Sequence, residues 1–216
     1  MPFLAARTGY SRAERLSDGI IHVSGLALVL VAVPALIAVA AVLNDDLTAL
    51  FAVSVYGLAL VAMILFSALY NMIPHPGWSG LLKRLDHSAI YAKIAGTYTP
   101  FTLLGGHGTW LLAGLWGAAI AGIGLKIAAP DRFRLLSVGL YLAMGWAGVF
   151  AGGTFIGTLS TPVFVLILTG GGLYSAGVIF YLLERLPFHY TIWHGFVLAA
   201  SLVFYAAVTL HVVQTA

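Results

Sequence analysis

The sequence has no cysteine and very little charge. Without cysteine, disulfides, thiolate metal sites and a cysteine nucleophile are excluded. Charged residues make up 8% of the 216 residues, whereas a soluble domain carries about 25%, so a soluble domain is excluded as well. The net charge of +3 does not indicate nucleic-acid binding, because the basic residues lie between apolar segments and no folded basic domain holds them.

What the sequence has instead is long apolar runs, with 61% hydrophobic residues. A membrane-spanning helix needs about 20 apolar residues in a row. Seven segments qualify, at about 19–43, 47–73, 87–104, 109–128, 135–156, 162–183 and 190–213. They must be helices, because isolated strands cannot satisfy their backbone groups in lipid. We therefore predict an all-α polytopic membrane protein, with an arm over residues 1–18, a seven-helix transmembrane domain over 19–216, and a loop over 74–86.

The lysines and arginines predict an orientation. Nine of the ten lie before the first span or near the loops that follow the second, fourth and sixth spans. The turns at 44–48, 105–108 and 157–161 carry none. By the positive-inside rule, the N-terminus is cytoplasmic. The tenth basic residue, Lys93, lies inside the third span, where a charged side chain is costly unless it pairs or reaches the interface.

Polar side chains gather at the predicted cytoplasmic end of the bundle. They are His22, Ser67, Asn71, Asp86, His87, His189, Tyr190 and His194. A polar layer on one side is typical of an intramembrane site that opens to the cytoplasm. The partners of such a protein would be membrane lipids, including a lipid ligand or substrate, and not nucleic acid.

Two pairs in this layer have helical spacing. Ser67 and Asn71 are four residues apart and share one helix face, as do Tyr190 and His194. With Asp86 at the start of the third span, the layout resembles a metal site built between helices. Catalytic zinc needs three protein ligands and an open position. His194 is a good ligand and Asp86 an adequate one, but the serine, asparagine and tyrosine oxygens are weak candidates.

Several blocks in fixed order resemble a known family. They are Ile21-His22, SALY from Ser67, RLDHSAIY from Arg84, AGTYTPF from Ala95, GVIFY from Gly177 and IWHGFVL from Ile192. The chain is similar over nearly its whole length to the haemolysin III branch of the progestin and adipoQ receptor family. The resemblance implies a seven-helix bacterial inner-membrane protein with the N-terminus inside. It also implies a zinc ion near the cytoplasmic face, and family members have been proposed to hydrolyse lipid amides such as ceramide.

The residues implied as zinc ligands are only partly present. The resemblance expects a histidine four residues after Ser67, where this chain has Asn71, and a histidine four residues before His194, where it has Tyr190. Ser67 is kept, and so is Asp86, which the family uses to hold the water. We therefore expect Asp86 and Ser67 as catalytic candidates and His194 as the one remaining ligand, with zinc possible at a degenerate site.

Three further residues are expected at the pocket. His189 is next to Tyr190, but at about 100° per residue it points away from the His194 face. His22 could be an outer partner of the site, or a helix-start histidine satisfied by a backbone carbonyl. Lys93 lies seven residues after Asp86 on nearly the same face, so we hypothesise that its ammonium replaces the lost metal charge, neutralises Asp86 and bonds Asn71 or Tyr190. The alternative for Lys93 is a lipid-facing residue without a role.

Three function classes follow from these residues. The first is a membrane protein of lipid sensing or homeostasis with a rearranged, metal-poor pocket. The second is a zinc-dependent lipid amide hydrolase. The third is a cytolytic or pore-forming protein, implied by the family name alone. A compact bundle with a polar layer on one side argues against this third class, because it has no polar stripe through the membrane.

Overall fold

The fold of the described residues is entirely helical. The computed structural model describes residues 11–73 and 75–216, without the side chain of Thr154. Its helices are α2 (Arg12–Leu43), α3 (Leu47–Met72), α4 (Pro76–Leu104), α5 (Thr109–Ala128), α6 (Arg134–Phe150), the short α7 (Gly153–Ile156), α8 (Thr161–Leu182) and α9 (His189–Gln214). Five of them, α2, α3, α5, α8 and α9, are long and apolar enough to cross a membrane. The predicted all-α polytopic class with seven long helices is confirmed.

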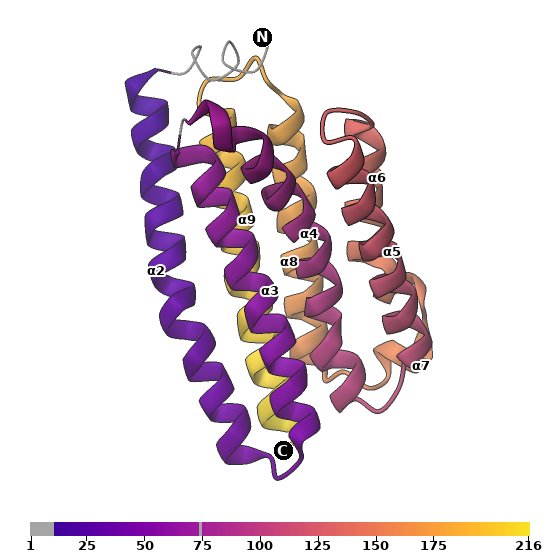
Figure 1. The fold of residues 1–216 in the computed structure, drawn as a ribbon. Coiled ribbons are helices and arrows are strands. Elements are labelled where there is room, and N and C mark those ends of the chain that lie inside the picture. Colours follow the sequence, from indigo (N-terminus) through magenta and orange to yellow (C-terminus); the bar gives the residue numbers. More distant parts are fainter. Residues whose placement is uncertain (1–10, 74) are drawn as a thin grey trace.

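The seven long helices run alternately up and down in one bundle (Figure 1). The start of α2 and the α3–α4, α5–α6 and α8–α9 connections lie at one end, which we call the N-terminal end. The α2–α3 and α4–α5 connections, α7 and the C-terminus lie at the other. The described lysines and arginines other than Lys93 therefore gather at the N-terminal end of the bundle. The cytoplasmic orientation of that end stays a prediction.

Three element boundaries differ from expectation. α2 begins at Arg12, within the expected arm, because Ser11 and Glu14 form a reciprocal capping box. α4 begins at Pro76, so most of the expected loop over 74–86 is helix. Proline is favoured in the first turn of a helix, where it does not interrupt the hydrogen bonds, so Pro76 begins α4 and does not break it. The fifth expected span is divided. α6 ends at Phe150 and Gly152 has a φ of +81°, a left-handed conformation that interrupts the helix before α7.

Helix α4 is packed closely on both sides. A Cβ at Gly96 would lie 3.0 Å from the Cβ of Ala59 on α3, so the two backbones approach each other there. On the other side, Gly122 of α5 lies directly against the ring of Tyr91, which is fully buried. α8 approaches α9 in the same way, with Gly170 against Phe204. These contacts fix the positions of the helices that carry the polar residues.

Candidate functional site

The bundle encloses a cavity of about 170 Å³ between its seven long helices. Its walls are mostly apolar, with Met63, Ile64, Ile90 and Val197 among the lining residues. The polar residues on its lining are His22, Ser67, Tyr70, Asn71, Asp86, His87, Lys93, Thr97, Tyr98, Lys126, Arg134, Ser137, Tyr141, Trp146, Tyr174, Ser175, Tyr181, Tyr190, Trp193 and His194. A mainly apolar cavity with polar groups on its lining is the usual form of a small-molecule site.

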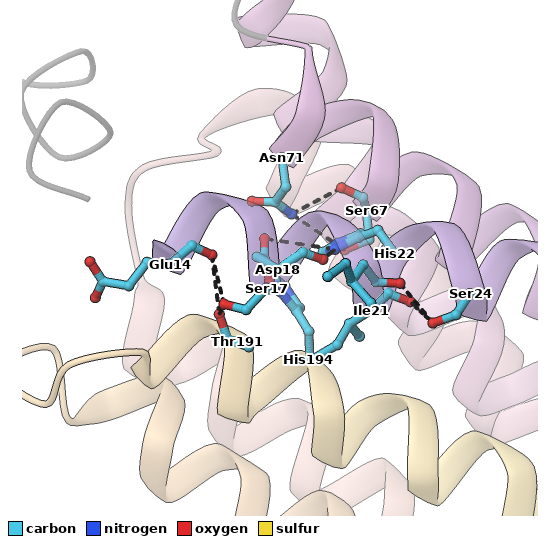
Figure 2. A network of polar contacts seen from close by, with 11 residues as sticks. Glu14, Ser17, Asp18, Ile21, His22, Ser24, Ser67, Asn71, Thr191 and His194 are labelled. Atoms are coloured by element: carbon cyan, nitrogen blue, oxygen red, sulfur yellow. Dashed lines mark hydrogen bonds and ion pairs between the residues drawn. The ribbon is translucent and has the colours of Figure 1, made fainter. Parts of the chain in front are cut away.

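Two histidines and an aspartate meet beside this cavity, and we call Asp18, His22 and His194 the His–Asp group (Figure 2). Each residue offers one ligand atom, and the three atoms lie within 4.8 Å of one another. Asp18 and His22 are one turn apart on α2, and His194 comes from α9. His22 is 4% exposed and His194 8%, so the group is nearly closed off from solvent.

Asp18 orients both histidines. Its Oδ1 lies 2.6 Å from Nδ1 of His194, and its backbone carbonyl lies 2.8 Å from Nδ1 of His22. With Nδ1 donating in both rings, each Nε2 carries the lone pair. The Nε2 of His22 is 3.2 Å from Oγ of Ser67, which can donate to it. The two rings meet edge to face with centroids 4.4 Å apart.

The first turns of α2 are tied to the start of α9, and this attachment holds the His–Asp group together. Oε1 of Glu14 accepts the backbone N–H of Phe188 at 2.9 Å, and Oγ of Ser17 lies 3.1 Å from Oγ1 of Thr191. Figure 2 shows Ser17 beside Thr191, and the next residue of α2, Asp18, contacts His194 about one turn further along α9. The order of contacts along α2 therefore matches the order along α9.

The donor chemistry of the His–Asp group fits a metal ion. Two imidazoles can supply two of the three protein ligands of a catalytic zinc site, and a carboxylate beside them can orient their rings. Ligands of a tetrahedral zinc at about 2.0–2.1 Å lie about 3.3 Å from each other, so the 2.6 Å between Asp18 and His194 is a hydrogen bond and not a pair of ligands. The histidines would therefore bind through Nε2. Asp18 would hold their rings in place, as carboxylates commonly do around metal-bound histidines.

The residues at the expected ligand positions are placed differently. Asn71 donates to the backbone carbonyl of Ser67 at 2.9 Å and lines the cavity. Tyr190 also lines the cavity, with its ring centroid 5.7 Å from that of His194. Asp86 reaches the same cavity from α4. The roles of Asp86 and Ser67 in catalysis stay predictions.

His189 lies outside this arrangement. It is the first residue of α9, is 4% exposed, and is not part of the cavity lining or of the His–Asp group. Its ring contacts that of Tyr190, with centroids 4.7 Å apart. His189 therefore lies near the site but not beside His194, as its position on the helix predicts.

Lys93 points into the bundle. It is 2% exposed and lines the cavity. Its ammonium lies 4.6 Å from the ring centroid of Tyr174 and 4.7 Å from that of Phe204, within cation–π distance of both. Among the described residues, the ammonium contacts these two rings. Nothing in this part of the chain supports the hypothesis that it bonds Asn71 or Tyr190. A lipid-facing Lys93 does not fit its burial.

The residue that the sequence reasoning missed is Asp18. It lies in the segment expected to be an arm, outside the ligand positions that the family resemblance implies. A signal was present, because Asp18 and His22 have the same four-residue spacing as Ser67–Asn71 and Tyr190–His194. His22 was predicted either to be an outer partner of the site or to bond a backbone carbonyl. In the structure it does both, because it contacts Ser67 and the backbone carbonyl of Asp18.

Comparisons with known proteins identify the family. Residues 11–205 match the family described as haemolysin-III related. The chain is 42% identical to hemolysin-3 of Bacillus cereus over 208 residues, which cover 94% of each chain. It is 38% identical to the hemolysin-3 homolog of Bacillus subtilis, over 93% of this chain and 95% of the relative.

A more distant relative is human. The chain is 26% identical to the monocyte to macrophage differentiation factor of Homo sapiens, over 77% of this chain and 72% of the relative. The family match and the two Bacillus relatives span almost the whole bundle, including α2, α3, α4 and α9, which carry the residues discussed above. This chain is therefore a membrane protein of the haemolysin III family.

Proposed function

We propose that this protein takes up a membrane lipid in its cavity and holds a divalent metal ion, with zinc as the natural candidate, at the His–Asp group. One observation carries the proposal: Asp18, His22 and His194 converge on the edge of a mainly apolar cavity, although two of the histidines that the family resemblance implies are absent. On this proposal the metal ligands come from α2 and α9, whereas the ligand positions implied by the family resemblance lie on α3 and α9. We place the protein in the inner membrane of a bacterium.

The reaction class that such a site supports is hydrolysis of a lipid amide. A bound metal ion polarises a carbonyl and lowers the pKa of a bound water. The chain would contribute two further groups, since Ser67 contacts His22 and Asp86 faces the same cavity. The apolar walls would bind the acyl chain and exclude water from the amide. A buried, mostly apolar pocket next to ligand-type side chains supports this assignment.

Metal content tests the proposal directly. The full-length protein, grown with zinc and purified without chelator, should contain about one equivalent of zinc per chain. His194→Ala and Asp18→Ala should lose most of it, because outer-sphere partners alone are worth about 10–100-fold in affinity. His189→Ala is the matched control, as it removes another buried histidine from the same end of α9. Equal metal loss in the His189 and His194 variants would contradict the assignment.

A second candidate is a metal-free lipid-binding protein. It is favoured by the 3.2 Å contact between Nε2 of His22 and Oγ of Ser67, which gives that nitrogen a partner without an ion. Protein that binds lipid but contains no zinc, and releases no fatty acid from ceramide in nanodiscs, would select this candidate. Fatty-acid release that a chelator abolishes would select the hydrolase.

A further inference from the structure

A second group of polar side chains lies on the α5–α6 side of the cavity, and it requires no metal. Lys126 is in the last turn of α5, Arg134 is the first residue of α6, and His87 comes from α4. All three line the cavity. They belong to the N-terminal end of the bundle, where α5 ends and α6 begins (Figure 1). We call these three residues the basic group.

Lys126 is a buried cation that bonds no acceptor among the described residues. It is 3% exposed, and among the described residues no hydrogen bond or ion pair is recorded for its ammonium. The end of α5 favours a positive charge, but the ammonium makes no recorded bond to the last carbonyls of that helix. The nearby opposite charge is Asp131, whose carboxylate is already paired with Lys83. A buried ammonium is costly unless it is paired.

The two neighbouring side chains also have buried nitrogens that can donate, since Nε of Arg134 carries a hydrogen and Nδ1 of His87 carries one in one of its two neutral tautomers. Nδ1 of His87 and Nε of Arg134 are buried and have no hydrogen-bond partner among the described residues. The other nitrogens of Arg134 are occupied, since Nη1 pairs with Glu184 and Nη2 donates to the carbonyl of Tyr181 at 2.9 Å. His87 lies within electrostatic reach of both Lys126 and Arg134. Buried polar groups without partners are rare and call for an explanation.

An anion with several acceptor oxygens would satisfy all three donors together. A phosphate group offers them and forms charge-assisted bonds with lysine and arginine. The basic group lies near an end of the bundle, and basic pockets between membrane helices bind anionic headgroups. The apolar cavity walls beside it would accept an acyl chain. Asp86 lines the same cavity, and its negative charge favours a singly charged phosphodiester over a doubly charged monoester.

We propose that the basic group of His87, Lys126 and Arg134 is a binding site for the phosphodiester headgroup of an anionic phospholipid, with the acyl chains directed along the cavity. The site goes beyond the proposed metal function, because it lies on other helices and needs no metal.

The test is lipid-dependent thermal stability of the full-length protein in detergent. Phosphatidylglycerol should raise the unfolding temperature of the wild type, and phosphatidylcholine with the same acyl chains should not. Lys126→Met keeps the apolar stem but removes the charge, and should weaken the apparent affinity for phosphatidylglycerol about tenfold or more. Lys126→Arg should retain most of it. Arg185→Met is the control, since it removes an exposed cation from the α8–α9 connection, outside the cavity lining, and it should respond like the wild type.

The possible outcomes separate clearly. Undiminished binding of phosphatidylglycerol by Lys126→Met would overturn the site, and so would an equal loss of binding in Arg185→Met. Inorganic phosphate is the probe for a soluble ligand. Equal protection by millimolar phosphate, lost in Lys126→Met, would keep the anion site but overturn the lipid as its ligand. None of these outcomes depends on metal content, so a failure here is distinguishable from a failure of the metal proposal.

Discussion

Gly122 is where α5 comes closest to α4, and replacing it with alanine tests the packing that positions the basic group. A Cβ at Gly122 would lie 2.5 Å from Cζ of Tyr91 and 2.6 Å from its Cδ1, whereas carbon atoms are in optimal contact at about 3.5–4.0 Å. The ring of Tyr91 is fully buried, and that of Tyr141 lies beside it with centroids 4.4 Å apart. Tyr91 therefore cannot swing away, and the helices must separate by about 1 Å.

The expected cost of this overpacking is about 1–3 kcal/mol. Gly124 provides the matched control, because it is on the same helix and a Cβ there would meet nothing within 4 Å. Both substitutions share the gain of about 1 kcal/mol that alanine has over glycine in a helix. The difference in unfolding free energy between Gly122→Ala and Gly124→Ala therefore isolates the steric cost.

Reversible unfolding in mixed detergent micelles measures that difference. Gly122→Ala should be less stable than Gly124→Ala by about 1–3 kcal/mol. It should also bind phosphatidylglycerol more weakly, because Lys126 is one turn after Gly122 and His87 one turn before Tyr91. Two variants of equal stability would show that α4 and α5 are not in the close contact described, and would refute the reasoning.

Three other predictions concern a cap, a buried hydroxyl and membrane leakage. The Asp46 carboxylate accepts the backbone N–H of Thr48, and this bond lowers the pKa of Asp46. The stabilisation from this cap of α3 is therefore complete above the ordinary aspartate pKa and is lost as the pH falls through the lowered pKa. Amide exchange at Thr48 should become faster in acid in the wild type but not in Asp46→Asn. Tyr98→Phe should cost about 1–3 kcal/mol of unfolding free energy, since its hydroxyl donates to Gly145 and accepts from Gly148; a denaturation curve matching the wild type would contradict this. Liposomes at high protein load should retain an encapsulated dye, and protein-dependent leakage would favour the cytolytic class.

The helices were predictable from sequence because their cause is local. Each apolar run is long enough to span a membrane and ends at charges, glycines or prolines, and this gave the seven long helices and the all-α class. The helix boundaries were less predictable where the same residue type can either end a helix or begin one. Pro76 looks like a loop residue by composition, but in the first turn its missing N–H costs nothing and its fixed φ favours the helix.

The site was only partly predictable because its residues are far apart in the chain. The polar layer and His22, Ser67, Asp86 and His194 could be named from sequence. That Asp18 contacts His194 could not, because the two residues are 176 positions apart and meet only after α2 has packed against α9. Lys93 shows the converse. The spacing of Lys93 from Asp86 suggested an ion pair between them. The direction of a side chain also depends on how the helices pack, and the Lys93 ammonium lies over two aromatic rings.

His22 connects the parts of the site on three helices. Its Nδ1 is held by Asp18 in α2, its Nε2 contacts Ser67 of α3, and its ring meets that of His194 from α9. A lone pair that accepts the Ser67 proton cannot also bind a metal, so metal binding at Nε2 would require the Ser67 hydroxyl to leave it and turn to another acceptor. The two candidate functions therefore differ in the partner of one nitrogen atom. Without a metal, Ser67 is an internal partner of His22; with a metal bound at Nε2, the Ser67 hydroxyl would become available to a ligand in the cavity.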